Sequence, residues 1–325
     1  MSREHTILLT GGMPSSSGPD PRYQLLPYPA DATIVEPRLA DGIRAIAAAG
    51  PRKISDELMQ QMPNLQIISN FGVGVDRVDV EAATRRGIVV TNTPDVLTDE
   101  VADFTLGLLI ATVRRIVAAD AFLRAGKWTA GDFPLSASLR GRTIGIVGMG
   151  RIGIAVANRC TAMGLDIAYH NRSRKPDLPY RYESSVIALA RSVDTLMVVV
   201  PGGPETDGMI DAAVLAALGQ NGVLVNVARG SVVVEQALVE ALRSGQLLAA
   251  GLDVFPEEPR VAQALIDLPN VVLTPHIGSA SLATRQAMGD LVFANIESWF
   301  ENGKPLTPVN HIALALQVAP VGQFP

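Results

Sequence analysis

Short runs of apolar and β-branched residues alternate with helical patterns through the first hundred residues of the chain. Helices are expected at 57–62 and 80–86, whereas the Pro-, Ser- and Gly-rich stretch 13–29 indicates a loop. The alternation predicts a parallel sheet with crossover helices. Strands are expected at 6–9, 33–35, 43–48, 65–69 and 88–90, the third of which also fits a helix.

The same alternation continues after residue 100. A long helical pattern runs over 99–124, and a last long helix is expected over 281–301. At 325 residues the chain is long enough for two domains of about 150 residues each. The predicted fold class is therefore α/β, with two doubly wound parallel-sheet domains. Further strands are expected at 143–147, 166–169, 195–200, 222–227, 249–254 and 271–273, and further helices at 154–163, 211–218 and 235–244.

A glycine triplet follows the expected strand 143–147. Gly148, Gly150 and Gly153 have the spacing G-x-G-x-x-G, and a helical pattern comes directly after them. The first glycine of such a motif allows a tight turn, the second lets N–H groups approach a pyrophosphate, and the third lets helix and strand pack closely. The N-terminus of the helix that follows the glycines favours the negative charge of the pyrophosphate. The motif predicts a Rossmann cofactor domain, joined to a smaller flavodoxin-like substrate domain.

Composition and charge narrow the classes of partner. Hydrophobic residues make up 48% of the chain and charged residues 18%, which is typical of a globular protein with a large core. The formal net charge is -5 and no Lys/Arg run occurs, so no nucleic-acid partner is expected. The longest nearly apolar run, 104–113, is far shorter than the roughly 20 residues of a membrane helix. With no recognisable export signal, a cytoplasmic location without membrane contact is expected.

Cys160 is the only cysteine, so neither a disulfide framework nor a cysteine-based metal site is expected, and no metal cofactor is predicted. The residue falls inside the helix predicted after the glycines. A buried thiol is expected there.

The segment after the second strand of the cofactor domain indicates which coenzyme binds. NAD sites place an acidic residue about 20 positions beyond the glycines, where it accepts the ribose hydroxyls. Asn171 takes that place here, followed by Arg172, Ser173, Arg174 and Lys175. A carboxylate would repel a 2′-phosphate by about 4 kcal/mol at ~4 Å and an effective dielectric constant of ~20, whereas guanidinium groups donate to it. The segment therefore predicts NADPH/NADP+ in preference to NADH/NAD+, with a solvated basic loop as the alternative.

Four histidines are available for acid–base chemistry. His5 and His311 lie near the two ends of the chain, and His170 lies in the loop expected beside the adenine. His276 follows the strand 271–273 of the cofactor domain. Ligands of such sheets bind outside the carboxyl ends of the strands, which favours His276 over a purely structural histidine.

Two other strand ends are expected to point into the same crevice. Arg229 follows the strand 222–227, and Asp253 and Glu258 lie at and after the end of 249–254. A guanidinium group can hold an α-keto acid through its carboxylate and polarise the ketone. An imidazolium can give a proton to the developing alkoxide, and a carboxylate beside it favours that charged form, which histidine with its ordinary pKa near 6.5 requires at neutral pH.

A third element, in the first domain, is the segment 69–79, SNFGVGVDRVD. Glycines directly after a strand allow close approach of the backbone, so the N–H groups of this segment could bind a carboxylate. A plain turn is the alternative.

Taken with these residues, the chain resembles the D-2-hydroxyacid dehydrogenase family, in its glyoxylate/hydroxypyruvate reductase branch. The likeness covers about residues 5–308. It implies NADPH-dependent reduction of small 2-keto acids, glyoxylate or hydroxypyruvate, to D-2-hydroxy acids, with a histidine as proton donor. The motifs that carry it are FGVGVDRVDV, RGIVVTNTPDVLTDEVADF, LRGRTIGIVGMGRIG, PGGPET, NVARGSVV, GLDVFPEEP and LTPHIGS.

The resemblance also implies roles for individual residues. Arg229 would orient the substrate, His276 would act as the acid/base, and Glu258 would pair with His276. Val73 and Gly74 would bind the substrate carboxylate through their N–H groups. Asp253 would meet the nicotinamide carboxamide. The residues expected to contact the cofactor are Thr98, Gly148, Met149, Gly150, Arg151, Ile152, Gly153, Asn171, Arg172, Ser173, Arg174, Pro201, Thr206, Val227, Ala228, Arg229, Asp253, His276 and Gly278.

Family topology makes the substrate domain discontinuous, formed by 1–100 and 288–325, with 101–287 as the dinucleotide-binding domain. A homodimer built around the cofactor domains is implied, with 101–128 in the interface. Trp128 either reaches the partner's active site or is a plain interface aromatic. Nothing in the resemblance accounts for residues 309–325.

Four alternatives to this function are weighed, of which two stay open. Formate dehydrogenases share the implied fold but pair the histidine with glutamine, and Glu258 argues against that chemistry. Phosphoglycerate dehydrogenases often add a regulatory domain, for which the segment after Val309 is too short. A non-catalytic NAD(P)-sensing interaction protein of the same fold and a reductase of bulkier 2-keto acids such as hydroxyphenylpyruvate stay open.

Overall fold

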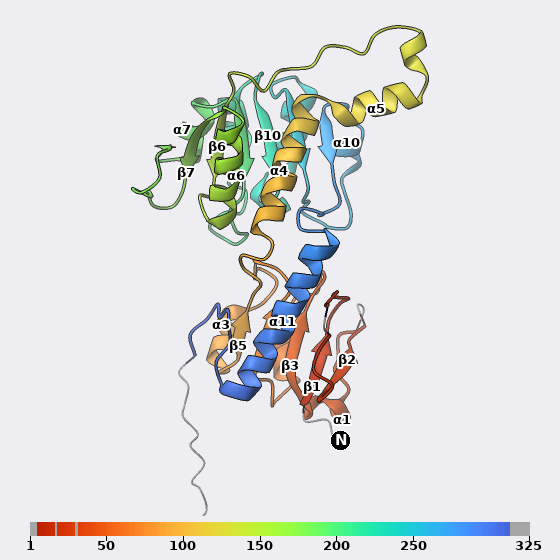
Figure 1. Ribbon diagram of the computed structural model, residues 1–325, viewed down its shortest axis with the longest axis vertical. Coiled ribbons are helices and arrows are strands. Elements are labelled where there is room, and N and C mark those ends of the chain that lie inside the picture. The colour runs from red at the N-terminus through yellow and green to blue at the C-terminus, as the bar shows by residue number, and fades with distance from the viewer. Residues whose placement is uncertain (1–4, 17, 30–31, 313–325) are drawn as a thin grey trace, which may run out of the picture. The chain divides into compact units, whose positions relative to one another are not determined.

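Parallel β-sheets form the centre of both halves of the chain. The computed structural model describes residues 5–16, 18–29 and 32–312 and divides into two compact units (Figure 1). Unit 1 comprises Met1–Pro94 and Gln286–Pro325, and unit 2 comprises Asp95–Arg285. Among the described residues, unit 1 contains a five-stranded sheet and unit 2 a seven-stranded sheet. The two parallel-sheet α/β domains predicted from the alternating pattern are therefore confirmed.

In unit 1, the sheet has the strand order β2-β1-β3-β4-β5. Helices α1 (Pro37–Ala40), α2 (Asp56–Gln60) and α3 (Val80–Arg85) pack on one face, and α11 (Leu282–Asn302) packs on the other. Successive residues of a strand point to opposite faces, so the strands contribute side chains to apolar clusters on both faces of the sheet. The strands are β1 (His5–Leu9), β2 (Tyr23–Pro27), β3 (Ile43–Ala48), β4 (Ile67–Asn70) and β5 (Val89–Thr91).

Two predictions for unit 1 are wrong. The expected strand at 33–35 is irregular, with Ile34 72% exposed, and it leads into α1. The expected loop at 13–29 contains β2 instead, which pairs along its whole length with β1. Proline is tolerated in β2 because an edge strand has one side without ladder hydrogen bonds, and the prolines of this stretch suggested a loop. The run at 43–48 is a strand and not a helix.

In unit 2, the sheet has the strand order β12-β11-β10-β9-β6-β7-β8, and all pairs are parallel. The strands are β6 (Thr143–Val147), β7 (Asp166–His170), β8 (Arg181–Tyr182), β9 (Thr195–Val198), β10 (Val223–Asn226), β11 (Ala249–Leu252) and β12 (Val271–Leu273). The helices are α4 (Thr98–Val113), α5 (Ile116–Arg124), α6 (Arg151–Ala162), α7 (Val186–Arg191), α8 (Ala212–Leu218), α9 (Glu235–Arg243) and α10 (Gln263–Ile266), with 3-10 turns η1 (Lys127–Thr129) and η2 (Gly230–Val232).

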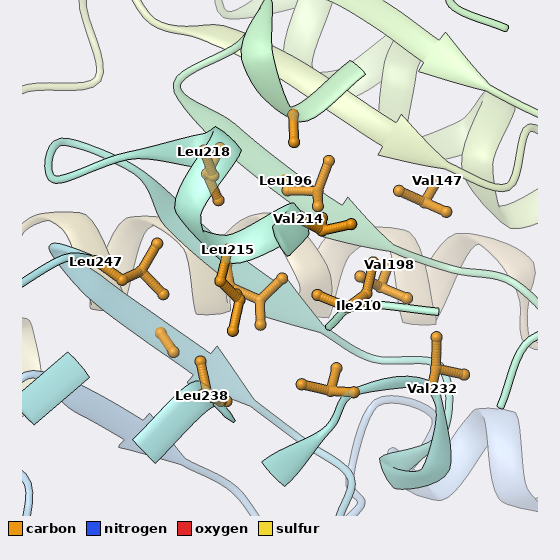
Figure 2. Packing of buried hydrophobic residues seen from close by; sticks show 14 of the residues in the cluster. Val147, Leu196, Val198, Ile210, Val214, Leu215, Leu218, Val232, Leu238 and Leu247 are labelled. Atoms are coloured by element: carbon orange, nitrogen blue, oxygen red, sulfur yellow. The ribbon is translucent and has the colours of Figure 1, made fainter. Parts of the chain in front are cut away.

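Two apolar cores cover the two faces of this sheet. On one face, strand residues pack with α7, α8 and α9. Figure 2 shows Leu196 of β9 beside Val214 of α8, and Val198 of β9 beside Ile210. On the other face α4 and α6 pack together on β6 and β10. Cys160 of α6 is buried in that second core, as predicted, and burial raises the pKa of its thiol to about 11.

The helix predicted over 99–124 is two helices. Arg115 adopts the left-handed conformation (φ 54°) between α4 and α5, which interrupts the helical hydrogen bonds. Helix α5 contains no buried residue and projects from the end of α4 in Figure 1. Within the described part of the chain, no helix is both long and apolar enough to cross a membrane.

Glycine 153 sets the distance between α6 and β6. A Cβ atom at this position would overlap the main-chain oxygen of Gly148 and would lie 3.4 Å from Cγ2 of Ile146. The close packing predicted for the third glycine of the motif is therefore confirmed, and it brings the first turn of α6 against the end of β6.

We expect Gly153→Ala to destabilise the protein although alanine is the better helix former. The overlap with a main-chain atom is an overpacking cost on the order of 2 kcal/mol, or about 4–8 °C in Tm. Gly107→Ala in α4 is the matched control, because a Cβ there meets no atom within 4 Å. Its Tm should stay equal or rise, and an equal response of both variants in thermal unfolding would contradict the packing role.

Candidate active site

The order of strands in unit 2 creates a crevice at the carboxyl end of β6. From β6 the chain runs outward through β7 and β8 and returns to β9 on the other side of β6. Ligands of open α/β sheets bind at such a switch point. Gly148 turns the chain there with φ +100°, and a Cβ on it would lie 2.8 Å from Cγ1 of Val200. The loops after β6 and β9 therefore touch.

The N-terminus of α6 opens at this crevice. Gly150 is the N-cap residue, no side chain caps the helix, and a Cβ on Gly150 would meet nothing within 4 Å. The first N–H groups of this 12-residue helix are thus left to an external acceptor, as in phosphate sites. Arg151, the first helical residue, forms a 2.9 Å ion pair with Asp95. This arrangement fits the pyrophosphate of a dinucleotide.

Asn171 and its basic neighbours stand beside the glycine turn. Oδ1 of Asn171 accepts a 3.3 Å hydrogen bond from the N–H of Met149, and its Nδ2 donates to the main-chain oxygen of Ser173. Arg172 and Arg174 are exposed. Asn171 thus follows β7 directly, and its amide contacts the glycine turn.

Other residues expected to contact the cofactor lie after β6, after β9 and at the start of α4. Met149 is fully buried and Ile152 is partly buried against the same core, so both side chains contribute to packing. The loop after β9 is tied by a 2.7 Å hydrogen bond from Thr206 Oγ1 to the main-chain oxygen of Pro201. Thr98 is the first residue of α4 and donates through its N–H to Asp95.

The loop after β10 carries Arg229 and is held from both sides. Buried Asn226 donates from Nδ2 to the main-chain oxygen of Arg229 and accepts at Oδ1 from the N–H of Ala228. The preceding residue, Val227, donates its N–H to Val198 of β9.

Gly230 joins this loop to the next. A Cβ on Gly230 would overlap main-chain atoms of Phe255 and Pro256. Glycine is therefore required for the loops after β10 and β11 to approach each other, which places Arg229 beside the segment that carries Glu258. No sequence motif had indicated this role for Gly230, or the role of Asn226.

The side chains of His276 and Glu258 are paired through a short contact. Nδ1 of His276 lies 2.9 Å from Oε2 of Glu258, and the other oxygen, Oε1, accepts a hydrogen bond from the N–H of Phe255. The His276 side chain is 44% exposed and that of Glu258 is 20% exposed. His276 has φ 54°, an uncommon backbone conformation for a residue with a side chain. The imidazole is thus held at Nδ1 and leaves Nε2 for chemistry.

Asp253 holds the segment that carries His276. Its Oδ1 accepts hydrogen bonds from Thr274 Oγ1 and the N–H of Ile277, and its Oδ2 accepts from the N–H of Gly278. The N–H of His276 donates to the main-chain oxygen of Asp253. The side chain is buried, which raises the pKa of its carboxyl, while the hydrogen bonds from the segment oppose that rise. Besides the nicotinamide contact implied by the resemblance, Asp253 therefore has a positioning role.

The carboxyl ends of β10, β11 and β12 lie side by side, because the three strands are neighbours in the sheet. In their register Asn226 lies opposite Leu252, and Leu252 lies opposite Leu273. The structure thus brings the loops of Arg229, Glu258 and His276 to one edge of one sheet.

The glycine segment of unit 1 forms a separate pinned loop. The main-chain oxygens at 72 and 74 both accept hydrogen bonds from Nδ2 of Asn70, and that of Val73 accepts from Nδ2 of Asn92. Throughout the described residues, no acceptor is paired with the N–H of Val73 or of Gly74. The loop therefore presents donors, as an anion site requires.

The chain is similar to proteins of one family over most of its length. Residues 106–278 match the family model "D-isomer specific 2-hydroxyacid dehydrogenase, NAD binding domain". Hydroxyphenylpyruvate reductase of Plectranthus scutellarioides is 46% identical over 294 residues (89% of this chain and 93% of the relative), and glyoxylate/hydroxypyruvate reductase A of Arabidopsis thaliana is 43% identical over 291 residues (89% and 93%).

A solved structure agrees with these matches. NADPH-dependent glyoxylate/hydroxypyruvate reductase of Sinorhizobium meliloti, crystallised with NADP and malonate, has a TM-score of 0.88 at 48% identity and covers 94% of this chain and 97% of its own. The match of the family model over more than half of the chain, together with these relatives, shows that the chain belongs to the D-isomer specific 2-hydroxyacid dehydrogenase family.

Proposed function

We propose that the protein reduces small 2-keto acids, glyoxylate and hydroxypyruvate, to D-2-hydroxy acids with NADPH. The observation that carries this proposal is the His276–Glu258 pair, held at the sheet edge where Arg229 emerges. Relatives named as glyoxylate/hydroxypyruvate reductases at 43% and 48% identity support it. Unit 2 is proposed as the dinucleotide-binding domain and unit 1 as the substrate domain.

The cofactor, when bound, supplies the hydride that is added to C2 of the keto acid. The open N-terminus of α6 fits its pyrophosphate, and Asn171 with Arg172 and Arg174 favours a 2′-phosphate over bare ribose hydroxyls. The Sinorhizobium meliloti relative is named as NADPH-dependent, which agrees with this preference.

His276 supplies the proton in this proposal. Glu258 fixes the ring through Nδ1, so Nε2 gives its proton to the substrate's carbonyl oxygen as that oxygen becomes an alkoxide. Water then returns a proton to the exposed ring. Asp253 keeps His276 in place through main-chain hydrogen bonds.

The substrate carboxylate needs donors. We assign this task to the guanidinium of Arg229, which also polarises the ketone, and to the N–H groups of Val73 and Gly74. The relative named hydroxyphenylpyruvate reductase, at 46% identity, keeps a bulkier 2-keto acid as the alternative substrate.

Assembly as a homodimer is part of the proposal. Helix α5 and the following segment expose Ile116, Val117, Leu123, Trp128 and Leu135, the last at 98%. Apolar side chains gathered on a projecting element are typical of a subunit interface. Sedimentation of the purified chain measures this state directly.

His276→Ala should abolish keto-acid reduction while leaving cofactor binding intact. We expect kcat to fall by about three to four orders of magnitude, because the general acid is lost, and the Kd for NADPH to change less than about threefold. The loss of NADPH absorbance with glyoxylate, hydroxypyruvate, pyruvate and phenylpyruvate measures kcat. Coenzyme fluorescence measures the Kd for NADPH. Binding without turnover by the wild type would instead support a sensor protein, and a small loss in the variant would remove His276 from the role.

Asn171→Asp combined with Arg172→Ala should move coenzyme preference toward NADH. The new carboxylate repels the 2′-phosphate and accepts ribose hydroxyls, and the guanidinium no longer pairs with the phosphate. The ratio of kcat/KM for NADPH to that for NADH should fall at least about tenfold. Arg191→Ala, which removes an exposed positive charge from the end of α7, is the control and should leave the ratio unchanged. An unchanged ratio in the double variant would refute the assignment.

A further inference from the structure

An ion pair spans the crevice proposed to bind the adenosine half of the cofactor. Nη1 of Arg172 lies 3.2 Å from Oε2 of Glu205. Arg172 follows β7 and Glu205 lies in the loop after β9, and these strands flank β6 without touching each other. Neighbouring strands are about 4.8 Å apart, so the two loops are separated by roughly 10 Å. The pair therefore crosses the carboxyl end of β6, where Gly148 turns the chain.

The main chain on both sides of this pair is held in place. Asn171, next to Arg172, is bonded to the N–H of Met149. Thr206, next to Glu205, is bonded through Oγ1 to Pro201 and through its N–H to Gly203. Each loop thus directs its charged side chain toward the other, although both side chains are exposed, at 87% and 78%.

The pair has a consequence for coenzyme choice that rests on the proposed function. A 2′-phosphate carries a charge of about -1.5 to -2 and requires the guanidinium of Arg172. The carboxylate of Glu205 competes for the same guanidinium and repels the phosphate. A coenzyme without the 2′-phosphate neither competes with Glu205 for Arg172 nor is repelled by it. Such a coenzyme leaves the ion pair undisturbed.

We propose that Glu205 is a coenzyme-specificity residue, which lowers the preference for the phosphorylated coenzyme by holding Arg172. Exposed ion pairs are weak, so the effect is a few-fold and decreases as salt is added. The preference for NADPH is therefore set by two loops, the basic one after β7 and the acidic one after β9.

The test is equilibrium binding to Glu205→Gln, measured by calorimetry at low salt. The probes are NADP+ and NAD+, together with adenosine 2′,5′-bisphosphate and 5′-AMP, which report on the adenosine end alone. We expect the two 2′-phosphorylated probes to bind about two- to fivefold more tightly, and NAD+ and 5′-AMP to bind as before. Asp207→Asn is the matched control, since it removes an exposed negative charge two residues away. The proposal would be overturned if the affinities for the phosphorylated and the unphosphorylated probes changed equally, or if neither changed.

Arg172→Ala separates this inference from the coenzyme assignment. If that variant binds NADP+ as tightly as the wild type, the proposed NADPH preference loses its support. If it binds NADP+ more weakly while Glu205→Gln changes nothing, only the role of Glu205 fails. In the Arg172→Ala background, Glu205→Gln should have no further effect on the phosphorylated probes, and an effect of full size there would contradict a role through Arg172.

Discussion

A buried carboxylate fixes the catalytic segment of this protein. Asp253 is 1% exposed and accepts hydrogen bonds from Thr274, Ile277 and Gly278, so the chain wraps around it at the end of β12. That wrapping holds His276 in a left-handed conformation with Nδ1 on Glu258. Removing a carboxylate that satisfies three donors would leave them unpaired in a buried place, so the position of the imidazole depends on Asp253.

Close packing of the main chain brings the rest of the site to the same sheet edge. Gly153 seats α6 on β6, and Gly230 lets the loop of Arg229 lie against the loop that leads to Glu258. Both contacts exclude a side chain. The uncapped start of α6 then contributes N–H groups. Arg151 in its first turn and Arg172 after β7 are each paired with a carboxylate of another segment. Positive charge at the crevice is thus partly balanced before any anion binds.

Most of the framework could be predicted from the sequence because it follows local rules. The strand–glycine–helix pattern around Gly148 identifies the dinucleotide motif, and periodicity locates the strands that end at Arg229 and His276. The break at Arg115 could not be predicted, because nothing in the run 99–124 marks a left-handed residue. Edge strand β2 could not be predicted because the prolines around it indicate a loop, and its own Pro27 is tolerated only once β1 is beside it. The contacts of Asp253 and Glu205 join loops that are far apart in the chain, and no spacing rule reports them.

The central claim is that Glu258 holds His276 through Nδ1 so that Nε2 can give its proton to the substrate. The most direct measurement is kcat for glyoxylate reduction by the wild type and by Glu258→Gln, with the Kd for NADPH measured beside it. The amide keeps the size of the side chain but replaces the carboxylate that fixes the ring, so kcat should fall at least about tenfold while the Kd for NADPH changes less than about threefold. An unchanged kcat, or a fall in kcat matched by an equal loss of NADPH binding, would contradict the account.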